Sequence, residues 1–442
     1  MTRVLITGIN YAPEETGIAP YTTKLAERLS RQGYRVTTLT GMPHYPAWRV
    51  SDDYAGAVTL HERRNGVDVE RRWHYVPRAQ SALRRGLYEG TFLLSGLSAL
   101  ALPAPDAVIG IVPSLSGGLL ARTLAARFRV PYGLVFQDLM GLAAEQSGMT
   151  GGGAVSAATR LAEGWAARGA SAVGVIAEGM RPYVESLGVK PGLIRRLRNW
   201  THVGEVSVER QAMREWLGLP ADALVCLHAG NMGRKQGLEN VIECARLASA
   251  TAPDMLFAFV GDGNQRAMLE ALAARHRLAN VRFLPLQPEQ LFPSVLASAD
   301  VLLVNQRGSV AEMSLPSKLT SYYAAGRPVV AAVAADSETA REIAWSSGGI
   351  VTAPDDPVAL LAALLRVAND AGLRAHLAGS AKRWSATVLS EDAALRSYEQ
   401  LLAALLAAGR HGRVHTAGRR RPKQIEQTHE ARTEARGDRW AA

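Results

Sequence analysis

Residues 223–239, ALVCLHAGNMGRKQGLE, set out a pattern that the rest of the chain repeats. An apolar run of strand length ends at Gly230, and the helix-like sequence ENVIECARLA begins at Glu239. Between them, a turn flanked by glycines carries Arg234 and Lys235 side by side. Continuous apolar strands that alternate with helices are typical of parallel sheets covered on both faces. Ligands bind at the carboxyl ends of such strands, so the pattern places two cations at a candidate site.

The alternation of apolar runs and helical patterns occurs in two series, separated by the polar stretch 198–208. Each series is long enough for its own sheet, so the sequence predicts an α/β protein of two doubly wound domains. A chain of 442 residues is also too long for one ordinary core. The expected strands are 3–8, 35–40, 106–112, 132–138 and 171–177, then 223–230, 255–263, 281–285, 300–305 and 327–333.

The domain boundaries follow from periodicity and charge. We expect an N-terminal domain over 1–200 and a second domain over 201–385. Residues 386–408 have alanine and leucine at helical spacing and are expected to cross back and pack on the first domain. Residues 409–442 are basic and poor in apolar residues, which predicts a disordered tail.

Composition limits the partners and the compartment. Residues 1–200 carry 23 Lys and Arg against 15 Asp and Glu, so the first half is expected to meet an anionic partner. Cys226 and Cys244 lie in apolar runs and are expected to be core residues in a reducing compartment. The N-terminus lacks the pattern of a signal peptide, and no apolar run has the length of a membrane span. These features predict a cytoplasmic protein.

The loop after the first expected strand, GINYAPEETGIAPYTT (8–23), has Gly17 where a helix begins. A helix start without side-chain bulk can approach a phosphate, although a turn glycine is the plain alternative. The glycine spacing of dinucleotide sites is missing, which disfavours an NAD site.

Three further strand ends carry candidate residues. Arg234 and Lys235 suit a diphosphate that leaves as negative charge builds on it, although a solvated basic turn is the alternative. The sequence VGDG ends another strand and gives a tight glycine loop at 260–263. After the strand that ends at Asn305, a loop contains Glu312, whose carboxylate could accept hydrogen bonds from sugar hydroxyls or be an ordinary surface acid. Ser317 then opens a helix as a potential cap and phosphate site, followed by Lys318.

Together these stretches resemble the retaining glycosyltransferases of family 4, which have the GT-B fold of two Rossmann-like domains facing a cleft. The stretches INYAPEETGIAPYT, PHYPAW, QDLMG, GNMGRKQGLE and LPSKLTSYYAAGRPV are similar to those of the colanic-acid-type exopolysaccharide glycosyltransferases. The resemblance covers nearly all of residues 1–408.

The resemblance implies roles for particular side chains. It implies catalytic roles for Arg234, Lys235 and Glu312, and donor binding by Gly17, Asn231, Gly261, Gly263, Ser317 and Lys318. On the acceptor side it suggests His44, Tyr45 and Asp138, with a histidine in a proline-rich surface turn as the alternative for His44. Two departures from the family pattern are Thr320 and Ser321, where relatives place a second glutamate, and Gln137, where relatives often have histidine. No metal-ligand set or cofactor motif is present, so none is predicted.

The expected activity is transfer of a sugar, with retention, from a UDP- or GDP-sugar to a glycan or lipid-linked acceptor in bacterial exopolysaccharide biosynthesis. Stretch 78–102 is basic and then apolar, which suits an anionic membrane surface, although a buried helix with a basic end fits equally. Alternatives are a nucleotide-sugar epimerase and a non-catalytic nucleotide-sugar-binding protein. Nucleic-acid binding is disfavoured, because no aromatic and basic face or known motif accompanies the charge.

Overall fold

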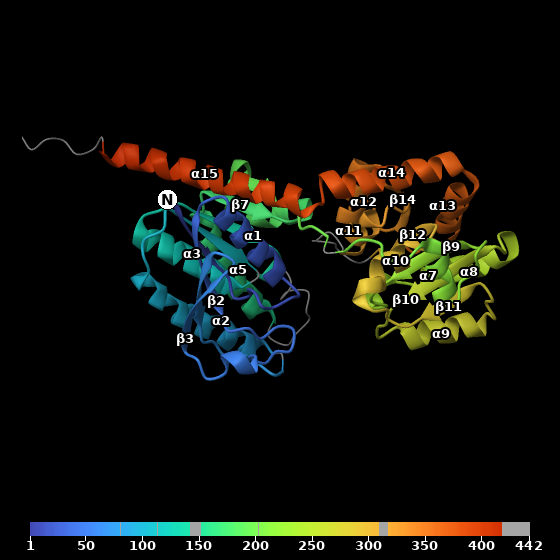
Figure 1. Ribbon diagram of the computed structural model, residues 1–442, viewed down its shortest axis with the longest axis horizontal. Coiled ribbons are helices and arrows are strands. Elements are labelled where there is room, and N and C mark those ends of the chain that lie inside the picture. Colours follow the sequence, from blue (N-terminus) through green and yellow to red (C-terminus); the bar gives the residue numbers. More distant parts are fainter. Residues whose placement is uncertain (80, 113, 142–151, 202, 309–316, 418–442) are drawn as a thin grey trace, which may run out of the picture.

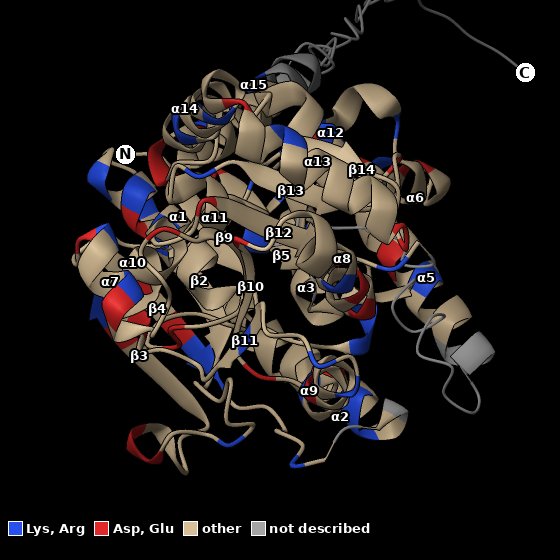
Figure 2. Cartoon of the chain, turned by 90° about the vertical axis from the view of Figure 1, so that its right-hand side faces the viewer, with Lys and Arg blue, Asp and Glu red and all other residues tan. Residues whose placement is uncertain are grey.

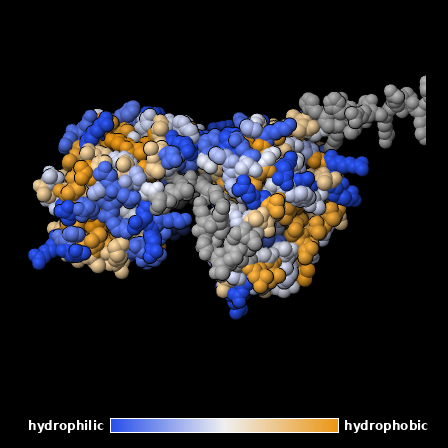
Figure 3. Space-filling view, turned by 180° about the vertical axis from the view of Figure 1, so that it is seen from behind, coloured by the Kyte–Doolittle hydropathy of each residue, from blue (hydrophilic) through white to orange (hydrophobic). Residues whose placement is uncertain are grey.

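Two separate sheets build two lobes in the computed structural model, which describes residues 1–79, 81–112, 114–141, 152–201, 203–308 and 317–417 (Figure 1). The lobes are joined beneath the helices α14, Ala371–Thr387, and α15, Glu391–Ala417. Seen in space-filling form, a notch separates them on the side opposite these helices (Figure 3). The predicted α/β architecture with two doubly wound sheets is confirmed.

The first sheet has eight strands in the order β3-β4-β2-β1-β5-β6-β7-β8. All neighbours are parallel except β3 and β4, which pair antiparallel. The strands are β1 Arg3–Thr7, β2 Arg35–Gly41, β3 Thr59–Arg64, β4 Val67–Arg72, β5 Ala107–Val112, β6 Tyr132–Phe136, β7 Ala172–Val175 and β8 Ile194–Arg196.

The second sheet has six parallel strands in the order β11-β10-β9-β12-β13-β14. Strands β10, β12 and β13 are buried along their whole length and apolar except for Asn305 at the end of β12, as expected for a parallel sheet covered on both faces. The strands are β9 Leu224–Ala229, β10 Met255–Val260, β11 Val281–Leu284, β12 Val301–Asn305, β13 Val329–Ala332 and β14 Gly349–Thr352.

Helices cover both faces of each sheet and close the two halves of each core. In the first lobe, α1 and α15 contribute to the core on one face, and α2, α3, α5 and α6 to that on the other. In the second lobe, α7, α10, α11 and α12 cover one face and α8, α9 and α13 the other. Their bounds are α1 Ala19–Arg31, α2 Ala82–Gly96, α3 Leu115–Phe128, α5 Gly152–Arg168, α6 Arg181–Ser186, α7 Arg210–Trp216, α8 Glu239–Thr251, α9 Arg266–Arg275, α10 Phe292–Ala297, α11 Ser317–Ala324, α12 Glu338–Ser346 and α13 Pro357–Asn369.

Each sheet has a point where the strand order reverses. In the first sheet, the order turns back between β1 and β5, and in the second between β9 and β12. Ligands of open α/β sheets bind at such switch points, outside the carboxyl ends of the strands. The loop that contains Gly17 follows β1, and the turn that contains Arg234 and Lys235 follows β9. Two of the stretches singled out in the sequence therefore lie at the switch points.

The hairpin β3–β4 was missed by the sequence analysis, as were the short strands β8 and β14. The hairpin is mostly polar, with Leu60 as the one apolar residue of β3 and Val67 and Val69 as those of β4, so it lacks the continuous apolar run used to find strands. A signal was nevertheless present, because Asn65 and Gly66 connect the two strands with φ of 48° and 84°. An Asn-Gly pair with positive φ at both residues is the preferred two-residue hairpin turn.

Helix α15 crosses back to the first lobe, as predicted. The Gln137 side-chain amide donates to the Tyr398 hydroxyl at 3.1 Å, and Arg28 Nε pairs with Glu399 at 2.7 Å. The helix bounds differ from the expected segment 386–408, because α15 begins at Glu391 and continues to Ala417. Residues 409–417, expected to be disordered, are therefore helical, and residues 418–442 lie outside the described part of the chain.

The two lobes also meet at helix α12 through buried charges. The Glu338 and Glu342 side chains are fully buried, and Arg196 Nη2 lies 3.4 Å from the first and 2.7 Å from the second. Glu338 also accepts a hydrogen bond of 2.7 Å from the Gly179 amide. The Arg196 guanidinium stacks 4.5 Å from the centre of the Trp345 ring. These contacts tie the end of the first sheet to the second lobe.

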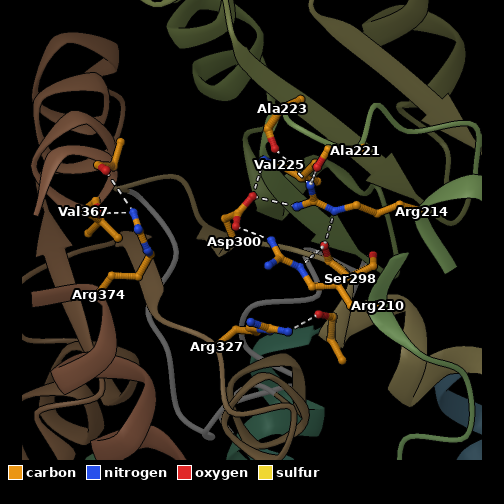
Figure 4. Close-up of polar contacts among 12 residues, drawn as sticks. Arg210, Arg214, Ala221, Ala223, Val225, Ser298, Asp300, Arg327, Val367 and Arg374 are labelled. Carbon is orange, nitrogen blue, oxygen red and sulfur yellow. Dashed lines mark hydrogen bonds and ion pairs between the residues drawn. The ribbon is translucent and has the colours of Figure 1, made fainter. Parts of the chain in front are cut away.

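A second group of charges, partly buried, lies within the second lobe around Asp300 (Figure 4). Asp300 Oδ2 accepts from Arg214 Nη2 at 2.7 Å and from the Val225 amide at 2.8 Å. Arg210 pairs with the other carboxylate oxygen. Arg214 also donates to the Ser298 carbonyl at 2.9 Å, so the pair joins α7, the end of α10 and the start of β9.

Candidate functional site

The turn after β9 carries the two adjacent cations into a pocket. Residues Arg234–Gln236 form a single 3-10 turn, and the Arg234 and Lys235 side chains are exposed. Among the described residues, no carboxylate forms an ion pair with either of them, whereas Arg246 and Arg266 on the next two helices are both paired. The pocket measures about 480 Å³ and is lined by Asn231, Gly233, Arg234, Lys235, Gln236 and Asn264. Its charge is positive, as an anion site requires.

Close backbone packing explains the glycines beside this pocket. At Gly261 (φ of 133°) a Cβ would lie 2.3 Å from the Gly230 carbonyl oxygen, and at Gly263 (φ of 154°) 2.5 Å from that of Met232. Both positions therefore demand glycine. The Asp262 carbonyl accepts from the Met232 amide at 2.7 Å, so the loops after β9 and β10 support each other. Gly261 and Gly263 shape the pocket wall and do not line it.

Lys318 brings a third cation to the same turn. Its Nζ donates to the Asn231 carbonyl at 3.4 Å, and burial lowers the pKa of this ammonium. The residue lies in the first turn of α11, which starts at Ser317 as predicted. Glu312, within 309–316, and the Ser317 side chain lie outside what the structure describes, so their predicted roles stay predictions.

On the first lobe, the Gly17 loop is joined to the loop of His44 and Tyr45. Gly17 has φ of 68°, and a Cβ there would lie 3.0 Å from the Tyr45 ring. The buried Glu14 carboxylate accepts from the His44 amide at 2.8 Å and the Tyr45 amide at 2.9 Å. Asn10 donates to its other oxygen at 2.9 Å. Glu14 therefore fixes the two loops together, a role that nothing in the sequence indicated.

The His44 side chain is buried, with an exposed fraction of 2%, which contradicts the alternative of a surface-turn histidine. Its Nε2 lies 3.0 Å from the Tyr88 hydroxyl, and its ring packs on His74 and Trp48. Asp138, the third acceptor-side candidate, is exposed just after β6 and accepts from the Leu139 amide at 2.8 Å. An acceptor role for these residues stays a prediction.

The candidates thus form two groups, one on each lobe. Asn231, Arg234, Lys235 and Lys318 meet at the second sheet, with Gly261 and Gly263 supporting them. Gly17, His44 and Tyr45 meet at the first sheet. Gly233, Gln236 and Asn264, which complete the pocket, were missed by the sequence analysis, because neutral residues carry no charge signal.

Buried histidines lie beneath both groups. Burial, with a smaller contribution from Lys318, lowers the pKa of His228 to about 3, and burial with nearby His44 lowers that of His74 to about 3. Both are therefore neutral in the folded protein near pH 7. The unfolded chain takes up their protons below its ordinary pKa of about 6.5.

We expect acid to destabilise the fold through these histidines. Because their folded pKa is depressed, their stabilising contribution is complete above about pH 6.5 and is lost as the pH falls toward 3. Each should add about 1.4 kcal/mol per pH unit to the slope of the unfolding free energy between pH 6 and 4. Urea unfolding across this range should give a smaller slope for His228→Gln than for the wild type. Equal slopes would contradict the assignment.

The described residues contain no group of three or more His, Cys, Asp and Glu side chains placed to hold a metal ion. None of their helices has both the length and the apolarity to cross a bilayer.

Known proteins match nearly the whole two-lobed chain. Residues 16–200 match the family described as glycosyl transferase 4-like domain, and residues 209–384 match glycosyl transferases group 1. The WcaI protein of Escherichia coli, named as a colanic acid biosynthesis glycosyl transferase, is 34% identical over 379 residues, which cover 83% of this chain and 92% of that protein.

Solved structures share the fold at low sequence identity. Sucrose-phosphate synthase from Thermosynechococcus elongatus gives a TM-score of 0.67 at 18% identity and covers 92% of this chain and 100% of its own. Anabaena HepE in complex with UDP gives a TM-score of 0.65 at 14% identity and covers 91% of this chain and 100% of its own. The family matches and the shared fold show that this chain belongs to the group 1 glycosyltransferases of the GT-B fold.

Proposed function

We propose that the chain transfers a sugar from a nucleoside diphosphate to an acceptor hydroxyl with retention of the anomeric configuration. The observation that carries the proposal is the pair Arg234 and Lys235, which lines a pocket at the switch point of the second sheet without a described carboxylate partner. HepE, a structural neighbour, was solved with UDP, which supports a nucleotide donor.

In the proposed reaction, the bond between the sugar C1 and the diphosphate oxygen breaks as the acceptor oxygen forms a new bond on the same face. Negative charge builds on the departing diphosphate, where the Arg234 guanidinium and the Lys235 ammonium stabilise it. The Lys318 ammonium, which donates to the Asn231 carbonyl, adds a third positive charge beside the same turn. The acceptor proton passes to the departing phosphate oxygen. We propose that side chains neutralise this charge without a metal or cofactor.

The acceptor that we propose is a lipid-linked glycan intermediate of bacterial exopolysaccharide biosynthesis. Support comes from the 34% identical relative, which is named for colanic acid biosynthesis and matches across 92% of its length. The loop that contains His44 and Tyr45 forms the proposed acceptor side. Glu14 fixes this loop beside the Gly17 loop.

A thermal-shift screen of UDP-, GDP-, ADP- and dTDP-sugars tests the donor. A ligand that binds only the folded chain, at a hundred times its dissociation constant, should stabilise it by about 2.7 kcal/mol. We expect the sugars of one nucleotide base to raise the melting temperature of the protein. The same nucleotide-sugars should release their nucleoside diphosphate when acceptor is present. No stabilisation by any of the four would contradict the proposal.

Two alternatives predict different outcomes in the same experiments. An epimerase would carry bound nicotinamide, which an absorbance scan of the purified protein detects. A nucleotide-sugar-binding protein without activity would shift in the screen but release no nucleoside diphosphate. Membership of the glycosyltransferase family favours transfer over both.

A lipid-linked acceptor lies in a membrane, and helix α2 has a surface that suits membrane binding. Leu83, Leu87 and Leu94 lie on one face of this helix at helical spacing and are exposed. Trp73, 46% exposed, lies beside the end of the helix, where its carbonyl accepts from the Ser95 hydroxyl at 2.7 Å. Basic residues lie at the N-terminal end of α2 (Figure 2), among them the exposed Arg84. We propose that this face lies on an anionic bilayer, where apolar and basic side chains bind together.

Liposome flotation tests the membrane surface. The wild type should float with vesicles that contain anionic phosphatidylglycerol and not with purely zwitterionic ones. The triple variant Leu83→Ser, Leu87→Ser, Leu94→Ser should lose at least about ten-fold in bound fraction, since each leucine buries apolar area in the bilayer. Leu161→Ser, at an exposed leucine on α5, is the matched control. Equal flotation of the triple variant and the control would exclude this surface.

A further inference from the structure

The turn that carries Arg234 and Lys235 is bonded on its far side by two residues from the end of β12. Arg307 Nε donates to the Arg234 carbonyl at 2.9 Å, and the Arg307 amide donates to the Lys235 carbonyl at 3.1 Å. The Asn305 side-chain amide donates to the next two carbonyls, those of Gln236 at 2.7 Å and Gly237 at 2.8 Å. Four consecutive carbonyl oxygens of the turn are therefore bonded to Asn305 and Arg307.

This arrangement sets the electrostatic polarity of the turn. Each peptide unit carries a dipole, and here the oxygen ends of four units point to the end of β12. Neither Asn305 nor Arg307 lines the pocket, so the negative ends of these dipoles are directed away from it. The cationic side chains remain on the pocket side. A turn that rotated its carbonyls toward the pocket would repel a phosphate that the cations attract.

Both bonded side chains are themselves fixed. Asn305 is buried, and its Oδ1 accepts from Asn240 Nδ2 at 2.8 Å, which orients its amide group toward the turn. Arg307 is held by an ion pair with Glu239 in the first turn of α8. Gly237 has φ of 54°, and a Cβ there would lie 2.7 Å from Arg307 Cγ, so the arginine stem packs directly on this glycine.

We propose that Asn305 and Arg307 are positioning residues that direct the Arg234–Lys235 turn toward the donor diphosphate. The inference rests on the proposed function, because it assigns these residues to the same phosphate site. They hold the turn through its backbone and make no contact with substrate. Their contribution to binding therefore passes through Arg234 and Lys235.

A double-mutant cycle on nucleoside diphosphate binding tests this dependence. UDP, GDP, ADP and dTDP are titrated calorimetrically into the wild type, and the tightest binder is used for Lys235→Ala, Arg307→Ala and the double variant. We expect Lys235→Ala to raise Kd at least about ten-fold in the wild type but less than about three-fold in the Arg307→Ala background. Such coupling separates positioning from a general loss of stability, which would leave the Lys235 factor unchanged.

Further variants keep the test decisive if Arg307→Ala folds poorly. Arg307→Lys keeps the positive charge but loses the fixed pair of Nε and Nη2 donors, so it should recover only part of the affinity. Asn305→Asp keeps the size but cannot donate to the two carbonyls, and should weaken binding at least as much as Arg307→Ala. Arg246→Ala, which breaks an Arg–Glu pair on α8, is the matched control and should leave Kd unchanged.

The possible failures are distinguishable. If no diphosphate binds the wild type, the proposed function fails, and the positioning role falls with it. If Lys235→Ala binds normally in the wild type, the cation pair fails. If Lys235→Ala weakens binding by the same factor in both backgrounds, the cation pair stands and the positioning role is overturned.

Discussion

Turnover should fall at least ten-fold in Arg234→Ala and in Lys235→Ala, and about a hundred-fold or more when both are replaced. A ten-fold loss corresponds to about 1.4 kcal/mol of transition-state stabilisation. The expectation follows from two exposed cations that line one pocket and have no carboxylate partner among the described residues. Charge built on a departing diphosphate interacts with them directly, whereas a paired cation would already be neutralised.

The measurement is initial-rate kinetics with the donor identified in the nucleotide-sugar screen, with kcat and KM determined separately. Arg246→Ala, on the neighbouring helix α8, gives the effect of removing an arginine that is already paired with Glu243. Near-normal kcat/KM in Lys235→Ala would remove the cation pair from the mechanism, even if the family assignment stands.

The largest expected effect on stability is that of Asp300→Ala, which should lower the free energy of unfolding of the second lobe by about 3 kcal/mol. Removing the carboxylate leaves the Arg214 guanidinium, whose side chain is 3% exposed, without its charge partner. It also leaves the amide of Val225, the second residue of β9, without its acceptor. Breaking one side of a buried ion pair typically costs about 3–5 kcal/mol.

Urea unfolding followed by circular dichroism measures this loss. Asp392→Ala is the matched control, because Asp392 pairs with Arg28 at the surface, with side-chain exposed fractions of 56% and 30%. That variant should lose less than about 1 kcal/mol. If the two variants lost equal amounts of unfolding free energy, the partly buried Arg214–Asp300 pair would stabilise the fold no more than a surface pair.

The fold was predictable because its strands carry their own signal. Apolar runs such as MLFAFV and VLLV identify parallel strands buried on both faces without knowledge of their partners. The hairpin at 59–72 was not found, because an edge pair exposed on one side mixes charged and apolar residues. Its Asn65–Gly66 turn was the only local indication.

The charged residues of the site could be predicted from the sequence, whereas the residues that hold its loops in place could not. Arg234 and Lys235 stand out in the sequence because they follow an apolar strand on a glycine-flanked turn just before a helix, and the structure places them in one pocket. Glu14, Asn305 and Arg307 act through backbone carbonyls and amides that are distant in sequence. Such bonds depend on which loops meet at a switch point, and a single sequence does not contain this information.

Helix α15 has a consequence for how the chain is made. Leu395, Leu401 and Leu405 of this helix pack in one cluster with Val4 and Ile6 of the first strand. The lobe that leaves the ribosome first thus lacks part of one wall of its core until residues 391–405, which follow the whole second lobe, have been translated. Part of an apolar face of the first lobe therefore stays uncovered while the second lobe is synthesised. During that time the second lobe can already fold.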